Sequence, residues 1–149
     1  MINDSTAPDG NDRLVSGNRH LLRYIPWWFP MLLIAVLNGI MREEWFRKHM
    51  NLTSAHQLST ISLIILFALY MALLFRNIRL RTASQALGVG TMWMVMTLLF
   101  EFGFGRWRGN SWETLLEDYN ILKGHIWIFV PLWICMAPYF FYQYFTRHK

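Results

Sequence analysis

The side chains of this 149-residue chain that could do chemistry gather beside the ends of its apolar segments. They are carboxylates, imidazoles, an amide and guanidinium groups, which can bind ions, move protons or form ion pairs. The candidates for a ligand or ion cluster are Asn38, Arg42, Glu43, His56, Glu101, Arg106, Asp118 and His125. If the chain crosses back and forth as four helices, these residues fall at one end of the bundle. We therefore expect a single polar cluster at that end.

Glu101 is the only charged residue within the apolar segment 86–104. Thr97 and Glu101 are four positions apart and so share one face of a helix. An ionised carboxylate that faces lipid without a partner is costly. We therefore expect Glu101 to point into the bundle and to pair with Arg42 or Arg106, with Asn38 or His56 nearby.

Histidine, aspartate and glutamate also ligate metals, but the sequence contains no pair of candidates with the local spacing of H-x-x-x-H or H-E-x-x-H. It also contains no Gly-rich phosphate loop and no nucleophile elbow. Cys135 is the only cysteine, so it cannot form an intrachain disulfide. The sequence therefore assigns no metal ligand, no catalytic residue and no cofactor.

Four apolar segments must position the candidate residues, at about 24–41, 56–76, 86–104 and 125–145. A helix rises about 1.5 Å per residue, so each segment approaches the hydrocarbon thickness of about 30 Å. Ser54 and Gln57 have the spacing of a capping box, which predicts that the second helix begins near Ser54. We expect an all-α polytopic membrane protein in which residues 21–149 form a four-transmembrane-helix bundle. The polar residues 1–20 are predicted to be a disordered cytoplasmic tail.

A short amphipathic segment precedes the last apolar segment. Its apolar positions follow the i, i+3, i+4, i+7 pattern of one helix face, with acidic residues on the other side. The residues on the apolar face are Trp112, Leu115, Leu116 and Tyr119. This pattern predicts a short helix in the membrane interface, anchored by these four side chains.

Composition supports the membrane assignment. Charged residues make up 15% of the chain, against about 25% in a soluble domain. The 14 Lys and Arg are scattered between apolar segments instead of forming a patch, which excludes nucleic acid as a partner. The loop 76–81 holds three arginines and no acid, so the positive-inside rule places both termini in the cytoplasm.

Three stretches resemble a family of small uncharacterised bacterial four-span integral membrane proteins. They are Asn38–Glu43 with His56–Ser59, Trp93–Gly105, and Ser111–Asn120 with Gly124 and Trp127. The resemblance covers roughly residues 30–140 and implies a multi-pass protein of the bacterial inner (plasma) membrane, with no assigned activity. Asn120 departs from the family pattern, in which an acid takes that position, and this leaves one ligand fewer for a cation.

The function predicted from these patterns is not enzymatic. We expect the polar cluster at the non-cytoplasmic helix ends to organise the bundle and to bind a partner or a small polar ligand. The alternative is a transporter or a proton- or ion-handling protein that uses Glu101, with Arg42 as its counter-charge. A membrane-embedded enzyme is the third hypothesis. The expected partners are the lipid bilayer and a membrane protein or a second copy of the chain.

Overall fold

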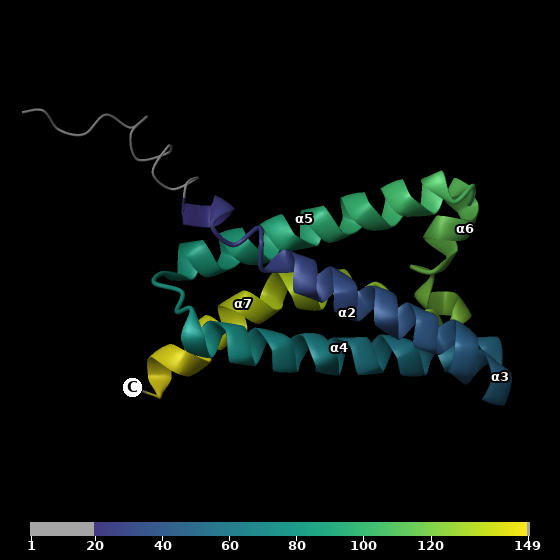
Figure 1. Ribbon diagram of the computed structural model, residues 1–149, viewed down its shortest axis with the longest axis horizontal. Coiled ribbons are helices and arrows are strands. Elements are labelled where there is room, and N and C mark those ends of the chain that lie inside the picture. Colours follow the sequence, from purple (N-terminus) through teal and green to yellow (C-terminus); the bar gives the residue numbers. More distant parts are fainter. Residues whose placement is uncertain (1–19, 149) are drawn as a thin grey trace, which may run out of the picture.

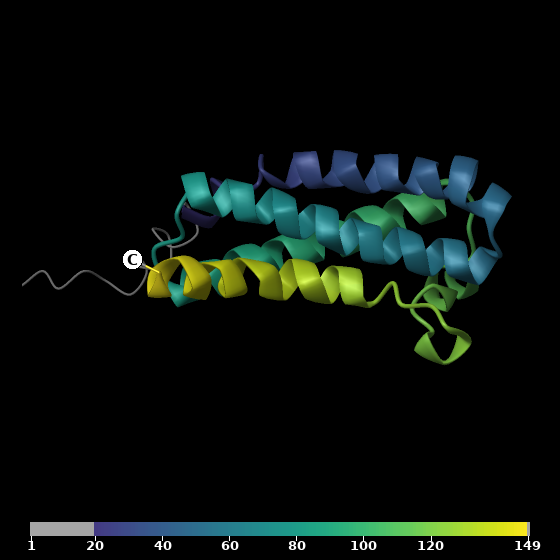
Figure 2. The same ribbon diagram turned by 90° about the horizontal axis from the view of Figure 1, so that it is seen from below.

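The computed structural model describes residues 20–148, and within this range the chain is all-helical, with no strand. The longer helices are α2 (Trp28–Met41), α4 (Leu52–Asn77), α5 (Ala83–Trp107) and α7 (Phe129–Arg147). They lie side by side in an elongated bundle (Figure 1 and Figure 2). The predicted all-α fold is therefore confirmed. Apart from His20, the predicted N-terminal tail lies outside the described residues.

Shorter elements lie at the end of the bundle opposite the C-terminus (Figure 1). α2 continues without a break into the π-helical turn η1 (Arg42–Phe46) and then into α3 (Arg47–His49). α6 (Trp112–Glu117) and the 3₁₀ turn η2 (Ile121–Lys123) form the connection between α5 and α7. The short helix predicted before the last apolar segment is therefore present as α6.

Local capping determines where the helices begin. The side chain of Asn51 accepts a hydrogen bond from the Ser54 amide at 2.8 Å, so α4 begins at Leu52. This start lies two residues before Ser54, close to the prediction, but the capping residue is Asn51 and not Ser54. Thr82 caps α5 in the same way by accepting from the Gln85 amide at 3.1 Å.

The last helix is shorter than the apolar segment 125–145 that predicted it. Gly124 has a φ of +83°, a left-handed conformation that ends the 3₁₀ turn, and the helix begins only at Phe129. Pro131 falls in its first turn, where a missing amide hydrogen costs little. The chain before Phe129 therefore forms a loop that can carry polar groups.

The core lies between the four long helices. Trp93 of α5 is fully buried and stacks on Phe75 of α4, with ring centroids 5.9 Å apart. Its indole nitrogen donates a hydrogen bond to the Tyr24 carbonyl at 3.0 Å, so this large side chain is buried without losing its polar partner. α5 and α7 approach each other closely at Gly90, where a Cβ atom would lie 2.0 Å from the Cys135 carbonyl oxygen.

Two of the described helices, α4 and α5, are long and apolar enough to cross a membrane, with mean hydropathies of 2.4 and 1.5 over their most apolar 18 residues. This suggests a membrane-associated protein. α2 has a regular α-helical run of only 14 residues, and α7 contains three tyrosines, a glutamine and two prolines. The sequence predicted four spans, whereas the described helices include two that are long and apolar enough to cross a membrane.

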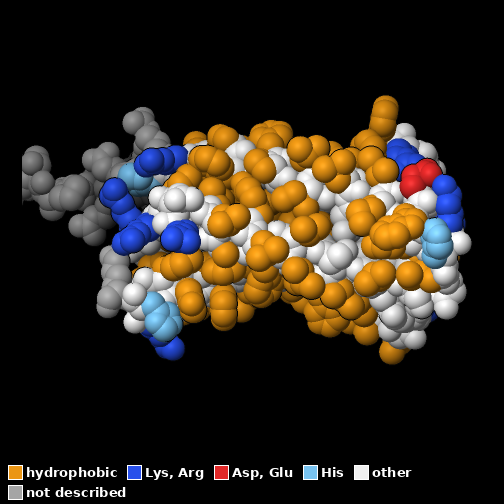
Figure 3. Space-filling model, turned by 60° about the horizontal axis from the view of Figure 1, so that its bottom comes forward, with side chains coloured by type: hydrophobic (Ala, Val, Ile, Leu, Met, Phe, Trp, Pro, Cys, Tyr) orange, Lys and Arg blue, Asp and Glu red, His pale blue; other side chains and the backbone are white. Residues whose placement is uncertain are grey.

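The surface of the bundle carries a broad band of hydrophobic side chains between two charged ends (Figure 3). Several large residues in the band are more than half exposed, including Leu33, Leu69, Leu73 and Leu99. A soluble monomer rarely exposes so continuous an apolar surface, whereas lipid would cover it without cost.

Candidate functional site at the histidine end of the bundle

Three side chains from distant parts of the chain meet where α4 begins. His56 lies in the second turn of α4, Asp118 directly follows α6, and His125 follows η2. Asp118 Oδ1 lies 3.2 Å from His56 Nε2 and 3.5 Å from His125 Nδ1. The possible ligand atoms of the three residues all lie within 4.8 Å of one another. We call these three residues the histidine cluster.

The loop before α7 is docked onto α4 by the neighbours of the two histidines. Gln57 Nε2 donates a hydrogen bond to the Gly124 carbonyl at 2.9 Å, which joins the residue after His56 to the residue before His125. The left-handed Gly124 permits the turn that brings His125 back toward α4. The side chain of Asn120 accepts from the Leu122 amide and closes the preceding turn. The two imidazoles are therefore held in place by local chain geometry.

The histidine cluster is partly buried, and two of its imidazole nitrogens have no hydrogen-bond partner. His56 is only 9% exposed, and its Nε2 can donate to Asp118, while its Nδ1 is buried with no hydrogen-bond partner. His125 Nδ1 is also buried and makes no hydrogen bond, although Asp118 lies within ion-pair distance. The carboxylate remains accessible, because the side chain of Asp118 is 44% exposed. Most buried polar atoms are paired, so two unpaired imidazole nitrogens at one place need an explanation.

Glu101 lies beside this cluster and is held by the residue after Asp118. The Tyr119 hydroxyl donates a hydrogen bond to Glu101 Oε2 at 2.7 Å, and the Tyr119 ring stacks on Phe102 with centroids 5.7 Å apart. Burial of the phenol, together with the nearby Glu101 carboxylate, raises the pKa of Tyr119 above its ordinary value. Tyr119 therefore stays neutral and donates a hydrogen bond to Glu101.

The predicted arginine partners of Glu101 were wrong. Arg42 instead contacts Glu43, with Nε 3.3 Å from Oε1, and Arg47 also pairs with that carboxylate. Arg106 Nη1 donates to the Asn110 carbonyl at 2.8 Å, and its guanidinium group lies over the Trp112 ring. The partner of Glu101 is Tyr119 and not an arginine, because the connection between α5 and α7 folds back over α5 and brings Tyr119 to Glu101.

Asn38 belongs to a separate polar contact between α2 and α4. It is 6% exposed, and its Nδ2 donates to Ser62 Oγ at 2.8 Å while its Oδ1 accepts from the Ser59 hydroxyl. The expected single cluster is thus divided into the histidine cluster, the Tyr119–Glu101 pair, the Asn38–serine contact, and surface contacts of Arg42, Glu43 and Arg106.

The four expected interfacial anchors have different surroundings. Trp112 and Leu116 are exposed at 55% and 56%, as an anchor in lipid headgroups requires. Leu115 lies against Gly105 of α5, whereas the hydroxyl of Tyr119 turns inward to Glu101. α6 therefore packs against the end of α5 with one part of its apolar face and leaves the other part open.

Sequence reasoning named all three members of the histidine cluster among eight candidates for a ligand or ion cluster, but did not single them out as a group of their own. No local motif could reveal it, because His56 and Asp118 are 62 residues apart and His125 belongs to a third element. It also missed Tyr119 as the partner of Glu101. The adjacency of Asp118 and Tyr119 was the available signal, since two polar side chains in succession after a helix can face two different neighbours.

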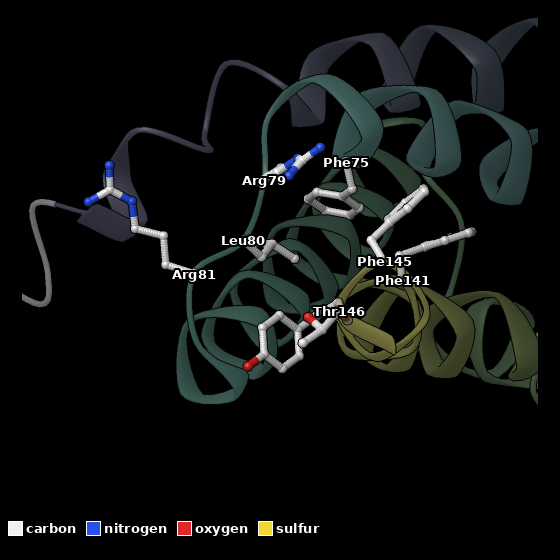
Figure 4. Close-up of a pocket in the computed structure, with 8 residues that line it drawn as sticks. Phe75, Arg79, Leu80, Arg81, Phe141, Phe145 and Thr146 are labelled. Carbon is white, nitrogen blue, oxygen red and sulfur yellow. Dashed lines mark hydrogen bonds between the residues drawn. The ribbon is translucent and has the colours of Figure 1, made fainter. Parts of the chain in front are cut away.

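The opposite end of the bundle has a different chemistry. A pocket of about 360 Å³ opens there between the end of α4, the following loop and α7 (Figure 4). Aromatic rings of Phe75, Phe141 and Phe145 line it, and the side chain of Arg81 extends away from them. Every acid among the described residues lies at the histidine end or close to it, whereas the pocket end carries Arg23, Arg76, Arg79, Arg81 and Arg147.

No protein family model, curated protein or solved structure matches this chain. Its function is therefore inferred from the geometry of its own residues. Two imidazoles and a carboxylate around one point can bind a cation, exchange protons or accept a small polar ligand.

Proposed function

We propose that the chain is a four-span integral membrane protein of the bacterial inner membrane that binds a small polar ligand at the histidine end. α4 and α5 are apolar and long enough to span. α2 and α7 run alongside them in the elongated bundle (Figure 1 and Figure 2), so a bilayer that contains α4 and α5 would also contain α2 and α7. The 19 residues of α7 would extend about 28 Å, close to the hydrocarbon thickness. The exposed apolar band supports this placement.

The charge distribution supports a cytoplasmic location for the pocket end. That end carries five arginines and no acid among the described residues, and it includes the α4–α5 connection and the C-terminal end of α7. The histidine end carries six cations and six acids, so its net charge is close to zero. Short loops rich in Arg and Lys remain on the cytoplasmic side during insertion. The histidine cluster would then face the periplasm.

The single observation that carries the ligand-binding proposal is the convergence of His56, Asp118 and His125 with two unpaired, buried imidazole nitrogens. A purely structural contact would gain stability by pairing those nitrogens, because a buried polar atom without a partner costs about 1–3 kcal/mol. A ligand that bonds to His125 Nδ1, the unpaired nitrogen that faces Asp118, removes that cost at this atom. The half-exposed carboxylate of Asp118 gives the ligand a path to the cluster.

A second candidate function is proton or ion handling through Glu101. The observation that favours it is the position of this acid within the apolar helix α5, hydrogen-bonded to a tyrosine directly after Asp118. Acids within membrane helices often serve as proton or ion sites. A chain of this size has little room for alternating access, so a transport role would require a second copy.

Two measurements test the proposed function. In a Cys135→Ala background, a single cysteine at Leu122 should react with a membrane-impermeant maleimide in intact cells, whereas one at Arg79 should react only after lysis. The reverse pattern would overturn the orientation.

In detergent, thermal unfolding should be compared with magnesium, zinc, cobalt, phosphate, acetate and ethylammonium present. We expect at least one of these to raise the Tm of the wild type and not that of Asp118→Asn. If none discriminates between the two proteins, the ligand site is refuted.

A further inference from the structure

The distances within the histidine cluster fit the coordination shell of a small metal ion. In a tetrahedral zinc site each ligand atom lies about 2.0–2.2 Å from the metal, so two ligand atoms lie about 3.4 Å apart. The two distances from Asp118 Oδ1 to the imidazole nitrogens are 3.2 and 3.5 Å. Asp118 Oδ1 therefore lies from each imidazole nitrogen at the spacing that coordination requires, and all three ligand atoms lie within 4.8 Å of one another.

The types of donor atom narrow the choice of ion. Two imidazole nitrogens and one carboxylate oxygen suit divalent first-row transition metals such as Zn²⁺, Co²⁺, Ni²⁺ and Fe²⁺. Mg²⁺ and Ca²⁺ prefer oxygen ligands, and Cu⁺ prefers sulfur. Cys135, the only sulfur nucleophile of the chain, instead contacts Thr91, with 3.9 Å between Sγ and Oγ1. The histidine cluster thus has the donor set of a transition-metal site.

A hydrogen bond between Asp118 and one histidine leaves the other histidine of the cluster without a partner. Asp118 Oδ1 faces both histidines, yet only His56 Nε2 makes a hydrogen bond to it. His125 Nδ1 is buried without a hydrogen-bond partner, directly beside the same carboxylate oxygen. A cation between the three groups would accept a lone pair from each neutral imidazole and neutralise the carboxylate. It would therefore use His125 Nδ1, which makes no hydrogen bond.

Surrounding contacts hold the three ligands in place. Gln57 fixes the chain beside His125 through Gly124, and Tyr119 fixes the chain beside Asp118 through Glu101. The His56 ring is also packed edge-on against Trp127, with centroids 5.9 Å apart. Such supporting contacts orient metal ligands and contribute to affinity.

We propose that His56, Asp118 and His125 form a binding site for a divalent transition-metal ion of the zinc class. The inference rests on the proposed ligand site at the histidine end and names the chemical class of its ligand. Three protein ligands leave a fourth coordination position for water or another small molecule, as in zinc sites that are not purely structural.

The test is direct metal binding by the full chain, purified in detergent through a tag without histidine and stripped with EDTA. Zn²⁺ affinity is measured by competition with a chromophoric chelator, and Co²⁺ is added separately to record the visible absorption of a tetrahedral site. We expect one ion per chain and a tetrahedral cobalt spectrum. His125→Gln and Asp118→Asn should each weaken Zn²⁺ binding more than about tenfold, since even loss of a supporting contact costs 10- to 100-fold.

His49→Gln is the matched control, because His49 is an exposed histidine at the same end of the bundle, bonded only to the Trp45 carbonyl. It should bind both metals like the wild type. Gel filtration of each variant verifies folding, and Asp118→Glu should recover part of the affinity if Asp118→Asn is folded but does not bind. Absence of stoichiometric binding by the wild type, or equal loss in His49→Gln and His125→Gln, would overturn the metal site. If acetate, phosphate or ethylammonium still stabilises the wild type through Asp118, the proposed function survives while the metal inference fails.

Discussion

The hydroxyl of Tyr119 donates a hydrogen bond of 2.7 Å to Oε2 of Glu101, and this contact joins the loop before α7 to the apolar helix α5. The same loop supplies Asp118 and His125 to the histidine cluster. The position of the cluster therefore depends on a hydrogen bond that neither histidine makes. Glu101 acts as a support for the loop in this structure, whatever further role it has.

Tyr119→Phe removes only the hydroxyl and should lower the free energy of unfolding by about 2 kcal/mol, the range for a hydrogen bond to a charged partner. The loss arises because the Glu101 carboxylate, 18 residues away in sequence, loses its donor. Unfolding in a denaturing detergent monitored by circular dichroism would measure it. Tyr144→Phe is the control, since Tyr144 is 51% exposed. Equal stability of the two variants would show that the hydrogen bond contributes nothing.

Gly90→Ala should disrupt the contact between α5 and α7. The new methyl group would meet the backbone carbonyl of Cys135, and a backbone carbonyl cannot move aside as a flexible side chain can. We expect destabilisation of about 1–3 kcal/mol or more, as for overpacking of a close contact. Gly103→Ala in the same helix has open space around the added methyl and should be neutral or slightly stabilising. A comparison of Tm for the two variants measures the effect, and similar losses in both would refute the close-approach explanation.

The all-helical fold could be predicted because each long helix overlaps one of the apolar segments. Helix ends were predicted less well. The capping box at Ser54 was a genuine pattern, yet Asn51 three residues earlier offered a better acceptor for the first turn. The start of α7 depends on the left-handed turn at Gly124, and the type of turn cannot be predicted from a single glycine in the sequence.

The candidate site, like the helix ends, could be predicted only in part. The sequence indicated that Glu101 needs a polar partner, because its surroundings are apolar, but it could not choose among partners. That choice depends on how the segment 108–128 folds back over α5 and α4, which is decided by tertiary contacts such as Gln57 with Gly124. The convergence of His56 and His125 follows from the same fold-back and has no signature in local spacing.

The Asn38–Ser59 contact between α2 and α4 should contribute measurable coupling energy. Asn38 is 6% exposed and Ser59 is 1% exposed, so neither side chain can turn to water. In a double-mutant cycle with Asn38→Ala and Ser59→Ala, we expect a coupling of about 0.6–1.7 kcal/mol, the range for hydrogen bonds between membrane helices. Asn77→Ala with Ser59→Ala is the control pair, because Asn77 lies at the other end of α4, where it bonds only to the Leu73 carbonyl. Additive losses for Asn38 and Ser59 would mean that the two side chains act independently.

The ion pair between Lys123 and Glu117 gives a pH-dependent prediction for the loop that carries the histidine cluster. Lys123 Nζ lies 2.7 Å from Glu117 Oε1, and this hydrogen bond and charge hold the pKa of Glu117 below its ordinary value of 4.5. A carboxyl whose pKa is lower in the folded than in the unfolded protein stabilises the fold above the unfolded value and loses that contribution as the pH falls through the folded value. Lys123→Met should therefore raise the Glu117 pKa toward 4.5, as measured by carbon-13 NMR titration of the side-chain carboxyl. Lys48→Met, which removes the partner of Glu44 at 2.9 Å, should leave the Glu117 titration unchanged. An unchanged pKa in Lys123→Met would show that Lys123 does not fix Glu117 in solution, and that other contacts, such as those of Asn120 and Gln57, hold the turn before His125.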